Sequence, residues 1–534
     1  MLSGEALPIT NKQPNGTKPN DTEPSCRLLP PPPSRVMGVG GNFWDLLKPY
    51  ARHEGFDFLR NKRVAVDLSF WLVQHETAIK DRARSPHLRL TFFRTINLFS
   101  KFGAFPVFVV DGSPSPLKSE ARIARFFRSS GIDSSSLPVA GDGASVERNS
   151  TFTKYIQECV ELLELLGMPV VKAKGEAEAL CAQLDAEGHV DACITSDSDA
   201  FLFGAKCVIK TFQSNTREPF EYYYMSDIEA GLGLKRKHLI AISLLVGNDY
   251  DLNGVQGVGL DTALRFSQTF SEDEILNRLR EIGNGDASPL RAKELISSLP
   301  VNIVVPQWDR KEKEQKKQDN WRLKVLSKIA LEPNFPNDAI IEMYLGNSHG
   351  YFTENDGPCI SWGSPKTEMV VDFLAYHQLW EPSYIRRRML PMLSTIFLRE
   401  KAKDPVKSLL YGQYEFDSID RLKIRYGHQF YVVKWKKSAP SLGCVSCTVP
   451  LEESDVQQDD VMEVDESIDP FDESDVPMID INNGCCFLLT DENTDLVHAA
   501  FPEEVDRFLQ EKELKELKRR KTGKPETAGS RGVQ

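Results

Sequence analysis

Three short apolar segments of this sequence end in an acidic residue or are closely followed by acidic residues, and this feature constrains the fold more than any other. The segments are Arg63–Asp67 (RVAVD), Pro106–Asp111 (PVFVVD) and Asp191–Thr195 (DACIT), the last followed by Asp197 and Asp199. Amphipathic segments separate them, and this alternation is typical of an α/β fold with a mostly parallel sheet. Parallel strands share one carboxyl edge, where open sheets bind ligands. The acids are therefore expected at one site.

The hydrophobic periodicity predicts further elements along the chain. The predicted strands are Pro169–Lys172, Gln413–Ile419 and Phe430–Trp435. The predicted helices are Leu90–Lys101, Phe152–Leu166, Glu176–Glu187, Lys235–Val246, Trp321–Leu331, Tyr384–Lys401 and an amphipathic helix within Asp491–Lys518.

The net charge of −12 is unevenly distributed. Residues 451–480 contain thirteen Asp or Glu and no Lys or Arg, so the chain without them has a net charge of +1. A near-neutral body with local basic faces is compatible with binding a polyanion. Because no run of 18 apolar residues occurs, a transmembrane helix and a membrane partner are not expected. The ten scattered cysteines favour a reducing compartment over a disulfide-rich scaffold.

Seven acids are candidate metal ligands because each lies at a strand end or near a helix terminus. They are Asp67, Asp111, Glu176, Glu178, Asp197, Asp199 and Asp249. If they converge, their mutual repulsion requires cations. Hard divalent ions such as Mg²⁺ prefer oxygen ligands, and two of them suit phosphodiester hydrolysis. Two alternatives stay open: single Asp residues often cap turns or helices, and the D-x-D pair in TSDSD also occurs in phosphatases.

Cysteine and histidine patterns carry a weaker signal. Cys444 and Cys447 form a C-x-x-C pair that could join Cys485 and Cys486 in a structural zinc site, but the acidic segment separates the two pairs. Trp71 and His75 share a helical face, where packing is the simpler interpretation. We find neither a Ser-His-Asp pattern nor a phosphate-binding P-loop motif in the sequence.

Two further patterns are suited to phosphate. The spacing of Lys118, Arg122, Arg125 and Arg128 predicts a basic stripe on one helical face; a solvated charged face is the alternative. Beside the acids, Lys118 and Arg125 could stabilise charge that develops in a transition state. The segment 254–259 (GVQGVG) predicts a hairpin between helices that offers backbone N–H groups to phosphate, with an ordinary glycine turn as the alternative.

Taken together, residues 37–270 resemble the flap endonuclease/XPG family of structure-specific nucleases. The segments that carry the resemblance are MGVGGNFWDLL, VAVDLS, VFVVDG, GEAEALCAQL, SDSDAFLFG and GNDY. Within that family the sequence is most similar to the GEN group, in particular its plant members, which cut Holliday junctions and flaps. The short segment 129–148 favours an open arch. Residues 414–437 resemble a chromodomain, which such resolvases carry after the nuclease core.

The resemblance implies roles for individual residues. The seven acids are implied as ligands of two Mg²⁺ ions, with Mn²⁺ as a substitute, and Lys118 and Arg125 as catalytic residues. The implied DNA contacts are Gly38, Arg122, Arg128, Gly254, Gly257 and Gly259, with K⁺ a further cofactor at the hairpin. Tyr414 and Trp435 could supply two walls of a methyl-lysine cage, but the acidic continuation typical of chromodomains is absent, so DNA contact or packing is expected instead.

The predicted architecture is an α/β fold with a PIN-like/XPG nuclease core and a mostly parallel sheet. A helix-hairpin-helix region and a small chromodomain-like β module follow the core. Met37 is predicted to be a real or alternative start. The division is a disordered extension (1–36), an N-terminal nuclease region (37–130), an arch or linker (131–150), an internal nuclease region (151–250), a hairpin and helical region (251–400), a β module (405–440), an acidic linker (441–482) and a C-terminal helix with a basic tail (483–534).

The sequence therefore predicts a nuclear, Mg²⁺-dependent endonuclease that cuts branched double-stranded DNA in repair and recombination. The expected products carry 5′-phosphate and 3′-hydroxyl ends, as the resemblance implies. The basic run Lys518–Lys524 suggests the nuclear location. Because a Holliday junction has two-fold symmetry, monomers are expected to pair on it. The alternatives are a flap-only or single-strand nuclease and a non-catalytic chromatin-binding protein.

Overall fold

The computed structural model describes most of the chain after residue 42. The described residues are 43–69, 96, 99–100, 103–113, 118, 143–212, 220–286, 308–352, 357–406, 409–411, 414–425, 428–437, 477–482 and 485–522. The predicted helix at 90–101 and the acidic segment up to residue 476 lie largely or wholly outside them. Within these residues, no helix combines the length and the apolar character needed to cross a membrane.

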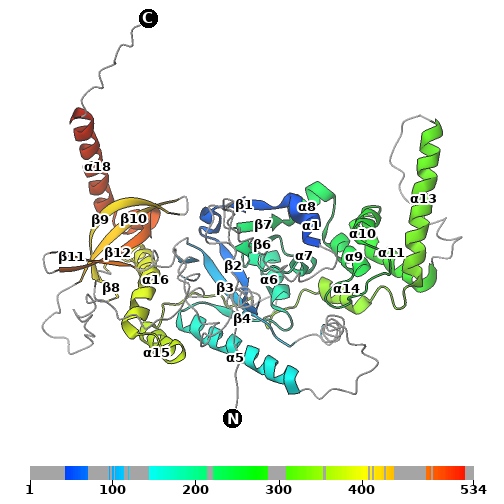
Figure 1. The fold of residues 1–534 in the computed structure, drawn as a ribbon, viewed down its shortest axis with the longest axis horizontal. Helices are drawn as coiled ribbons and strands as arrows, with labels where there is room; N and C mark the ends of the chain where they lie inside the picture. Colours follow the sequence, from blue (N-terminus) through cyan, green and yellow to red (C-terminus); the bar gives the residue numbers. More distant parts are fainter. Residues whose placement is uncertain are drawn as a thin grey trace, which may run out of the picture. The chain divides into compact units, whose positions relative to one another are not determined.

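A seven-stranded sheet forms the first part of the fold (Figure 1). Its strand order is β1-β7-β6-β5-β2-β3-β4. The five strands from β6 to β4 run parallel; at one edge β7 pairs antiparallel with β6, and β1 pairs antiparallel with β7. The sheet is thus mostly parallel, as predicted. The strands are β1 (Arg52–Glu54), β2 (Arg63–Asp67), β3 (Phe105–Val110), β4 (Val170–Lys172), β5 (Ala192–Ile194), β6 (Cys207–Phe212) and β7 (Phe220–Tyr224).

The central strands are apolar on both faces because helices cover both sides of the sheet. Along β2, Ala65 packs into one hydrophobic cluster, whereas Val64 and Val66 pack into the other. The first cluster contains residues of α6 (Ala177–Ala186), α7 (Asp199–Phe203) and α9 (Arg236–Val246). The second contains residues of α5 (Gly143–Leu165), α15 (Thr367–Gln378) and α16 (Pro382–Lys403). A short helix, α1 (Phe43–Leu47), begins the described chain.

Several helices follow the sheet along the chain. The glycine segment 254–259 connects α9 to the next helix, as predicted. The following helices are α10 (Leu260–Ser267), α11 (Glu272–Glu281), α13 (Trp308–Leu331) and α14 (Asp338–Leu345); α8 (Met225–Leu232) precedes α9. The buried apolar residues of α10, α11, α13 and α14 belong to the same hydrophobic cluster as α9. In this region α10 and α11 pack against α9, and α14 packs against α7.

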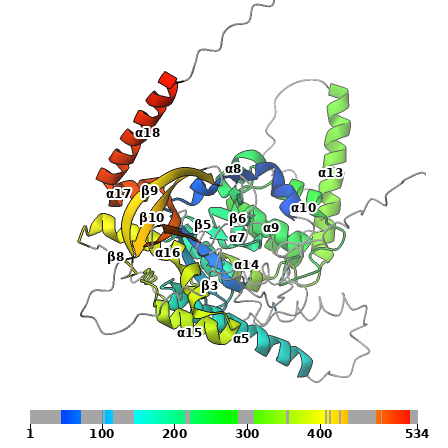
Figure 2. The same cartoon turned by 60° about the vertical axis from the view of Figure 1, so that its left-hand side comes forward.

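The second sheet is antiparallel and larger than the sequence predicted. Figure 2 shows its two long curved strands, β9 and β10. Its order is β11-β12-β10-β9-β8. The strands are β8 (Leu409–Leu410), β9 (Tyr414–Arg425), β10 (His428–Lys437), β11 (Met478–Asn482) and β12 (Cys485–Asn493).

Two sequence predictions about this region need correction. The β module does not end at residue 440, because β12 pairs with β10 from Phe430 to Lys436 and β11 pairs with β12. The acidic linker therefore ends before β11 rather than at residue 482. The helix within 491–518 is also interrupted: α17 (Thr494–Ala500) and α18 (Pro502–Thr522) are separate helices. Proline opens α18, a position where its missing N–H group costs nothing.

The core of the second sheet contains the two aromatic residues considered for a methyl-lysine cage. Trp435 is fully buried, packs edge-on against Phe397 and Phe416, and donates from its indole nitrogen to Thr490 Oγ1 at 2.8 Å. Tyr414 is also buried. Neither ring is open to a ligand in this structure. Packing, rather than cation recognition, is what these two side chains do.

Candidate active site

The carboxyl edge of the seven-stranded sheet carries the first two acids. Asp67 is the last residue of β2, and Asp111 follows β3 directly. Both strands are parallel and in register, with Asp67 opposite Val109. Thr195 Oγ1 donates to Asp67 Oδ2 at 3.4 Å. Asp111 accepts a hydrogen bond from Ser69 Oγ and a second, at 2.8 Å, from the backbone nitrogen of Ala177. Asp111 thereby ties β3 to the first turn of α6.

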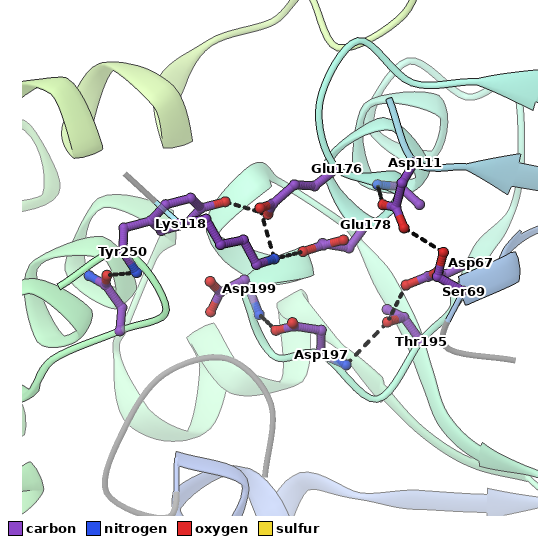
Figure 3. A network of polar contacts seen from close by, with 12 residues as sticks. Asp67, Ser69, Asp111, Lys118, Glu176, Glu178, Thr195, Asp197, Asp199 and Tyr250 are labelled. Atoms are coloured by element: carbon purple, nitrogen blue, oxygen red, sulfur yellow. Dashed lines mark hydrogen bonds and ion pairs between the residues drawn. The ribbon is translucent and has the colours of Figure 1, made fainter. Parts of the chain in front are cut away.

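Helix α6 presents the next two acids at its N-terminal end. Glu176 is the extended residue that precedes the helix, and Glu178 lies in its first turn. The change from extended to helical backbone between them lets both carboxylates point to one cation. That cation is the ammonium group of Lys118, whose Nζ lies 2.8 Å from Glu176 Oε1 and 3.3 Å from Glu178 Oε1 (Figure 3). Position 118 is the one described residue of the predicted basic stripe.

The segment after β5 places the third pair of acids. The backbone nitrogen of Asp197 donates to Thr195 Oγ1, and Asp197 Oδ1 accepts from the backbone nitrogen of Asp199 at 2.9 Å. These bonds form a tight turn that leads into α7. Both carboxylates are buried. Their side chains lie beside Lys118 and Glu178, so three pairs of acids from distant parts of the chain meet in one place (Figure 3).

Asp249, the seventh acid, belongs to the same cluster. It is buried and follows the end of α9, where Gly247 adopts a positive φ of 100°. Its charge raises the pKa of both Asp197 and Asp199, which places it within electrostatic range of them. The structure thus brings the seven sequence-predicted acids to one edge of the sheet.

Burial and mutual repulsion control the protonation of this cluster. Burial, with the charge of Asp199, raises the pKa of Asp197 well above its ordinary value, and burial with the charge of Asp249 does the same to Asp199. Burial raises the pKa of Glu178 to about 7 although Lys118 opposes the shift. For Lys118, burial alone would lower the pKa, but Glu178 and Glu176 outweigh it and raise the pKa. The cluster is therefore short of positive charge.

The donor set fits a hard cation. It consists of carboxylate oxygens, which Mg²⁺ and Mn²⁺ prefer. Within the described part of the chain, the buried Oδ1 of Asp199 has no hydrogen-bond partner, so it is an unsatisfied acceptor inside the cluster. Among the same residues, no three His, Cys, Asp or Glu side chains already stand at metal-ligand spacing. The ammonium group of Lys118 lies between two of the acids and provides the local positive charge.

Four polar side chains that contact the acids were not predicted from the sequence. Ser69 and Thr195 orient Asp111 and Asp67, as described above. Tyr250 donates its hydroxyl to Glu176 Oε2, and Tyr344 donates its hydroxyl to Asp199 Oδ2 at 2.8 Å. Tyr250 stands next to Asp249 in the motif GNDY and could have been found there. Tyr344 lies far from every motif and left no signal.

The remaining basic and DNA-binding candidates are only partly described. Gly38, Arg122, Arg125 and Arg128 lie outside the described residues, as do Trp71, His75, Cys444 and Cys447. Cys485 and Cys486 lie in strand β12. For these positions the sequence expectations remain predictions.

The glycine hairpin has the expected backbone but few free amides. Gly254 and Gly257 have positive φ values of 54° and 74°, and Gly259 precedes α10. A Cβ on Gly254 would lie 2.5 Å from the nitrogen of Gly247, so glycine is required there. Three hairpin amides donate within the protein: those of Val255, Gln256 and Val258. A phosphate contact at this hairpin would have to use its other groups.

Comparison with known proteins decides the family. Residues 37–131 match the XPG N-terminal domain and residues 167–249 match the XPG I-region, and these two ranges contain the seven acids. The chain is 55% identical to flap endonuclease GEN-like 1 of Arabidopsis thaliana, over 93% of this chain and 90% of that protein. The chain belongs to the GEN group of the flap endonuclease/XPG family. The family, the α/β nuclease fold and a DNA endonuclease activity, predicted from the sequence, are confirmed.

Two further similarities support this membership. Flap endonuclease GEN-like 1 of Oryza sativa is 51% identical over 90% of this chain and 89% of that protein. The crystal structure of human GEN1 in complex with Holliday junction DNA is 25% identical, with a TM-score of 0.62, over 90% of this chain and 100% of that one. That match covers more of the chain than the two segments that match the XPG family models.

Proposed function

We propose that this chain is a structure-selective endonuclease that hydrolyses phosphodiester bonds at branched DNA, including Holliday junctions, 5′ flaps and replication forks. The observation that carries the proposal is the buried cluster of acids around Lys118 at the carboxyl edge of the sheet. Membership of the GEN group supports it. So does the similarity to human GEN1, whose structure contains Holliday junction DNA.

The acids of the cluster are proposed to hold divalent cations. The seven carboxylates would share two Mg²⁺ ions, with Mn²⁺ as a substitute. Bound there, the ions would supply an activated water and stabilise the leaving 3′ oxygen. A buried, oxygen-rich site that is short of positive charge favours such ions over softer metals.

The protein's own groups have separate tasks in this mechanism. Asp67 and Asp111 are fixed by hydrogen bonds to Thr195, Ser69 and the start of α6, so they can keep their orientation when the substrate arrives. Lys118 contacts Glu176 and Glu178 and can donate to the scissile phosphate, where it would stabilise the additional negative charge of the transition state. We assign a similar role to Arg125.

The DNA on either side of the cut is proposed to be held without reading its sequence. Gly38, Arg122, Arg128 and the hairpin glycines Gly254, Gly257 and Gly259 are the proposed contacts, with K⁺ at the hairpin. Contacts to the phosphate backbone fix the orientation of the DNA on the protein but carry no sequence information, so the shape of the branched DNA would determine selectivity. We further propose that the protein is a monomer in solution and pairs on four-way junctions, and sedimentation with and without junction DNA tests this proposal.

The cleavage test compares intact four-way, nicked four-way and 5′-flap substrates in Mg²⁺ and in EDTA. Protein that starts at Met1 and protein that starts at Met37 are used in parallel. Paired, symmetric nicks on the intact junction in Mg²⁺ are the expected result. Cutting of flaps or single strands alone would favour the narrower nuclease instead. Absence of cutting on all three substrates would overturn the proposed function.

The location of the protein in the nucleus remains a proposal. It rests on the basic run Lys518–Lys524, which begins in the last turn of α18. A fluorescent fusion that lacks residues 515–534 is expected to stay in the cytoplasm, and its entry into the nucleus would contradict the assignment. A purely chromatin-binding function is disfavoured by the burial of Tyr414 and Trp435.

A further inference from the structure

Helix α14 reaches the acid cluster from outside the segments that define the family. The matched segments end at residue 249, whereas α14 spans Asp338–Leu345. Its Tyr344 is fully buried and donates its hydroxyl to Asp199 Oδ2 at 2.8 Å. A residue 145 positions after Asp199 in the sequence therefore contacts one of the proposed metal ligands directly.

The tyrosine is held rigidly where it makes this bond. Its ring packs against those of Phe203 and Tyr250, with ring centroids 5.0 Å and 5.7 Å away. Its carbonyl oxygen accepts from Arg236 Nη2 at 2.5 Å, and Nε of the same guanidinium donates to the carbonyl of Leu202 at 2.7 Å. Arg236 thus joins α14 to α7, the helix that begins at Asp199.

The loop after α14 fixes the segment that carries the glutamates. The carbonyl of His349 accepts from the backbone nitrogen of Lys174 at 2.7 Å, and the nitrogen of His349 donates to Gln183 Oε1 at 2.7 Å. Ala173 and Gly350 form an isolated antiparallel bridge. These contacts hold the residues just before α6 and the last turn of that helix. One downstream segment, residues 338–350, therefore braces both acid-bearing helices.

The hydrogen bond from Tyr344 makes the two carboxylate oxygens of Asp199 different from each other. Oδ2 is occupied by Tyr344, whereas the buried Oδ1 has no hydrogen-bond partner among the described residues. A carboxylate with one oxygen fixed and the other unsatisfied has a defined orientation, which is what an outer residue supplies to a metal ligand. We infer that Tyr344 is a positioning residue, which orients Asp199 toward the divalent cation of the cluster. This inference rests on the proposed function and extends it to a residue beyond the family's segments.

The test removes only the hydroxyl group. Tyr344→Phe keeps the ring and its packing, and Tyr351→Phe is the matched control because Tyr351 is 68% exposed. Two properties are measured: Mg²⁺ affinity without DNA, from the Mg²⁺-dependent rise in unfolding temperature, and kcat and KM on a branched substrate. Tyr344→Phe is expected to weaken Mg²⁺ binding by about 10- to 100-fold and to lower kcat as well, with KM for DNA unchanged. Tyr351→Phe should match the wild type.

A third variant separates orientation from loss of stability. Ile341→Val removes one methyl group from the buried face of α14 and leaves Asp199 untouched. If Tyr344→Phe binds Mg²⁺ like the wild type, or if Ile341→Val weakens Mg²⁺ binding equally, the positioning role is wrong. If the wild-type protein cuts no branched DNA, the proposed function fails. The Mg²⁺-binding comparison still tests Tyr344 in that case, so the two failures can be told apart.

Discussion

Replacing Lys118 by methionine should change metal binding and catalysis in opposite directions. Methionine keeps most of the length of the side chain but removes the ammonium group that contacts Glu176 and Glu178. In the absence of metal, that ammonium group partly neutralises the acids. A divalent cation has to compete with it for the same oxygens. When the ammonium group is absent, Mg²⁺ experiences less repulsion, and the oxygens of Glu176 and Glu178 are available to bind it.

The structure gives the size of the effect. The Nζ–O distances are 2.8 Å to Glu176 and 3.3 Å to Glu178. At an effective dielectric constant near 20, they correspond to attractions of about 6 and about 5 kcal/mol, respectively. Desolvation of the buried charges offsets much of this, and removing one partner of a buried pair typically costs about 3–5 kcal/mol. We therefore expect Lys118→Met to destabilise the metal-free protein by about 3 kcal/mol and to raise its Mg²⁺ affinity about tenfold.

The assay measures Mg²⁺ affinity by calorimetry and cleavage under single-turnover conditions. The control is Lys154→Met, because Lys154 is a surface lysine that pairs with Glu158 four residues along α5. We expect Lys118→Met to bind Mg²⁺ more tightly and to cut more slowly, because the group proposed to stabilise the transition state is gone. Weaker Mg²⁺ binding by this variant would show that Lys118 does not compete with metal, and the reasoning would be wrong.

Three further results are expected. The metal-free protein should lose stability as pH rises, because burial raises the pKa of Glu178 from an ordinary 4.5 to about 7 in the folded state. The stabilisation from protonated Glu178 is complete below pH 4.5, and about 3 kcal/mol of it is lost as pH rises through 7. Urea unfolding in EDTA at a series of pH values measures this loss. Saturating Mg²⁺ should abolish this pH dependence. Trp435→Ala should lower the free energy of unfolding of the second sheet by about 3–5 kcal/mol without altering Mg²⁺ affinity, because the indole is fully buried. Limited proteolysis tests this, and a variant as resistant as the wild type would contradict it. Gly254→Ala should weaken duplex binding at unchanged Mg²⁺ affinity, as fluorescence anisotropy would measure, since its Cβ meets backbone at 2.5 Å.

The position of the acids could be predicted because the signal is local. An apolar strand that ends in Asp67 or Asp111 can be recognised within six residues, and parallel pairing then places both acids at one edge. The same argument applies to Asp197 and Asp199 after β5. The turn from extended to helical backbone at Glu176 is likewise encoded by its immediate neighbours. Strand order was not needed to infer that these acids meet.

The parts that could not be predicted depend on contacts distant in sequence. Tyr344 contacts Asp199 from 145 residues away in the sequence. No motif near Tyr344 indicates that its hydroxyl group contacts a candidate metal ligand. Strand β12 completes the second sheet from beyond the acidic segment, so periodicity alone could not assign it to β10. The stripe spacing predicts a helical face that carries Lys118, and the rest of that stripe lies outside the described residues. It could not predict that the ammonium group enters the acid cluster, because that depends on where α6 lies.

Anomalous diffraction from crystals of the protein with branched DNA and Mn²⁺ tests the central claim most directly. The expected result is Mn²⁺ density within coordination distance of Glu178, Asp197 and Asp199, with the ammonium group of Lys118 displaced from its present contacts. Mn²⁺-dependent cleavage by the same preparation, combined with no Mn²⁺ density among these carboxylates, would contradict the claim that this cluster is the catalytic centre.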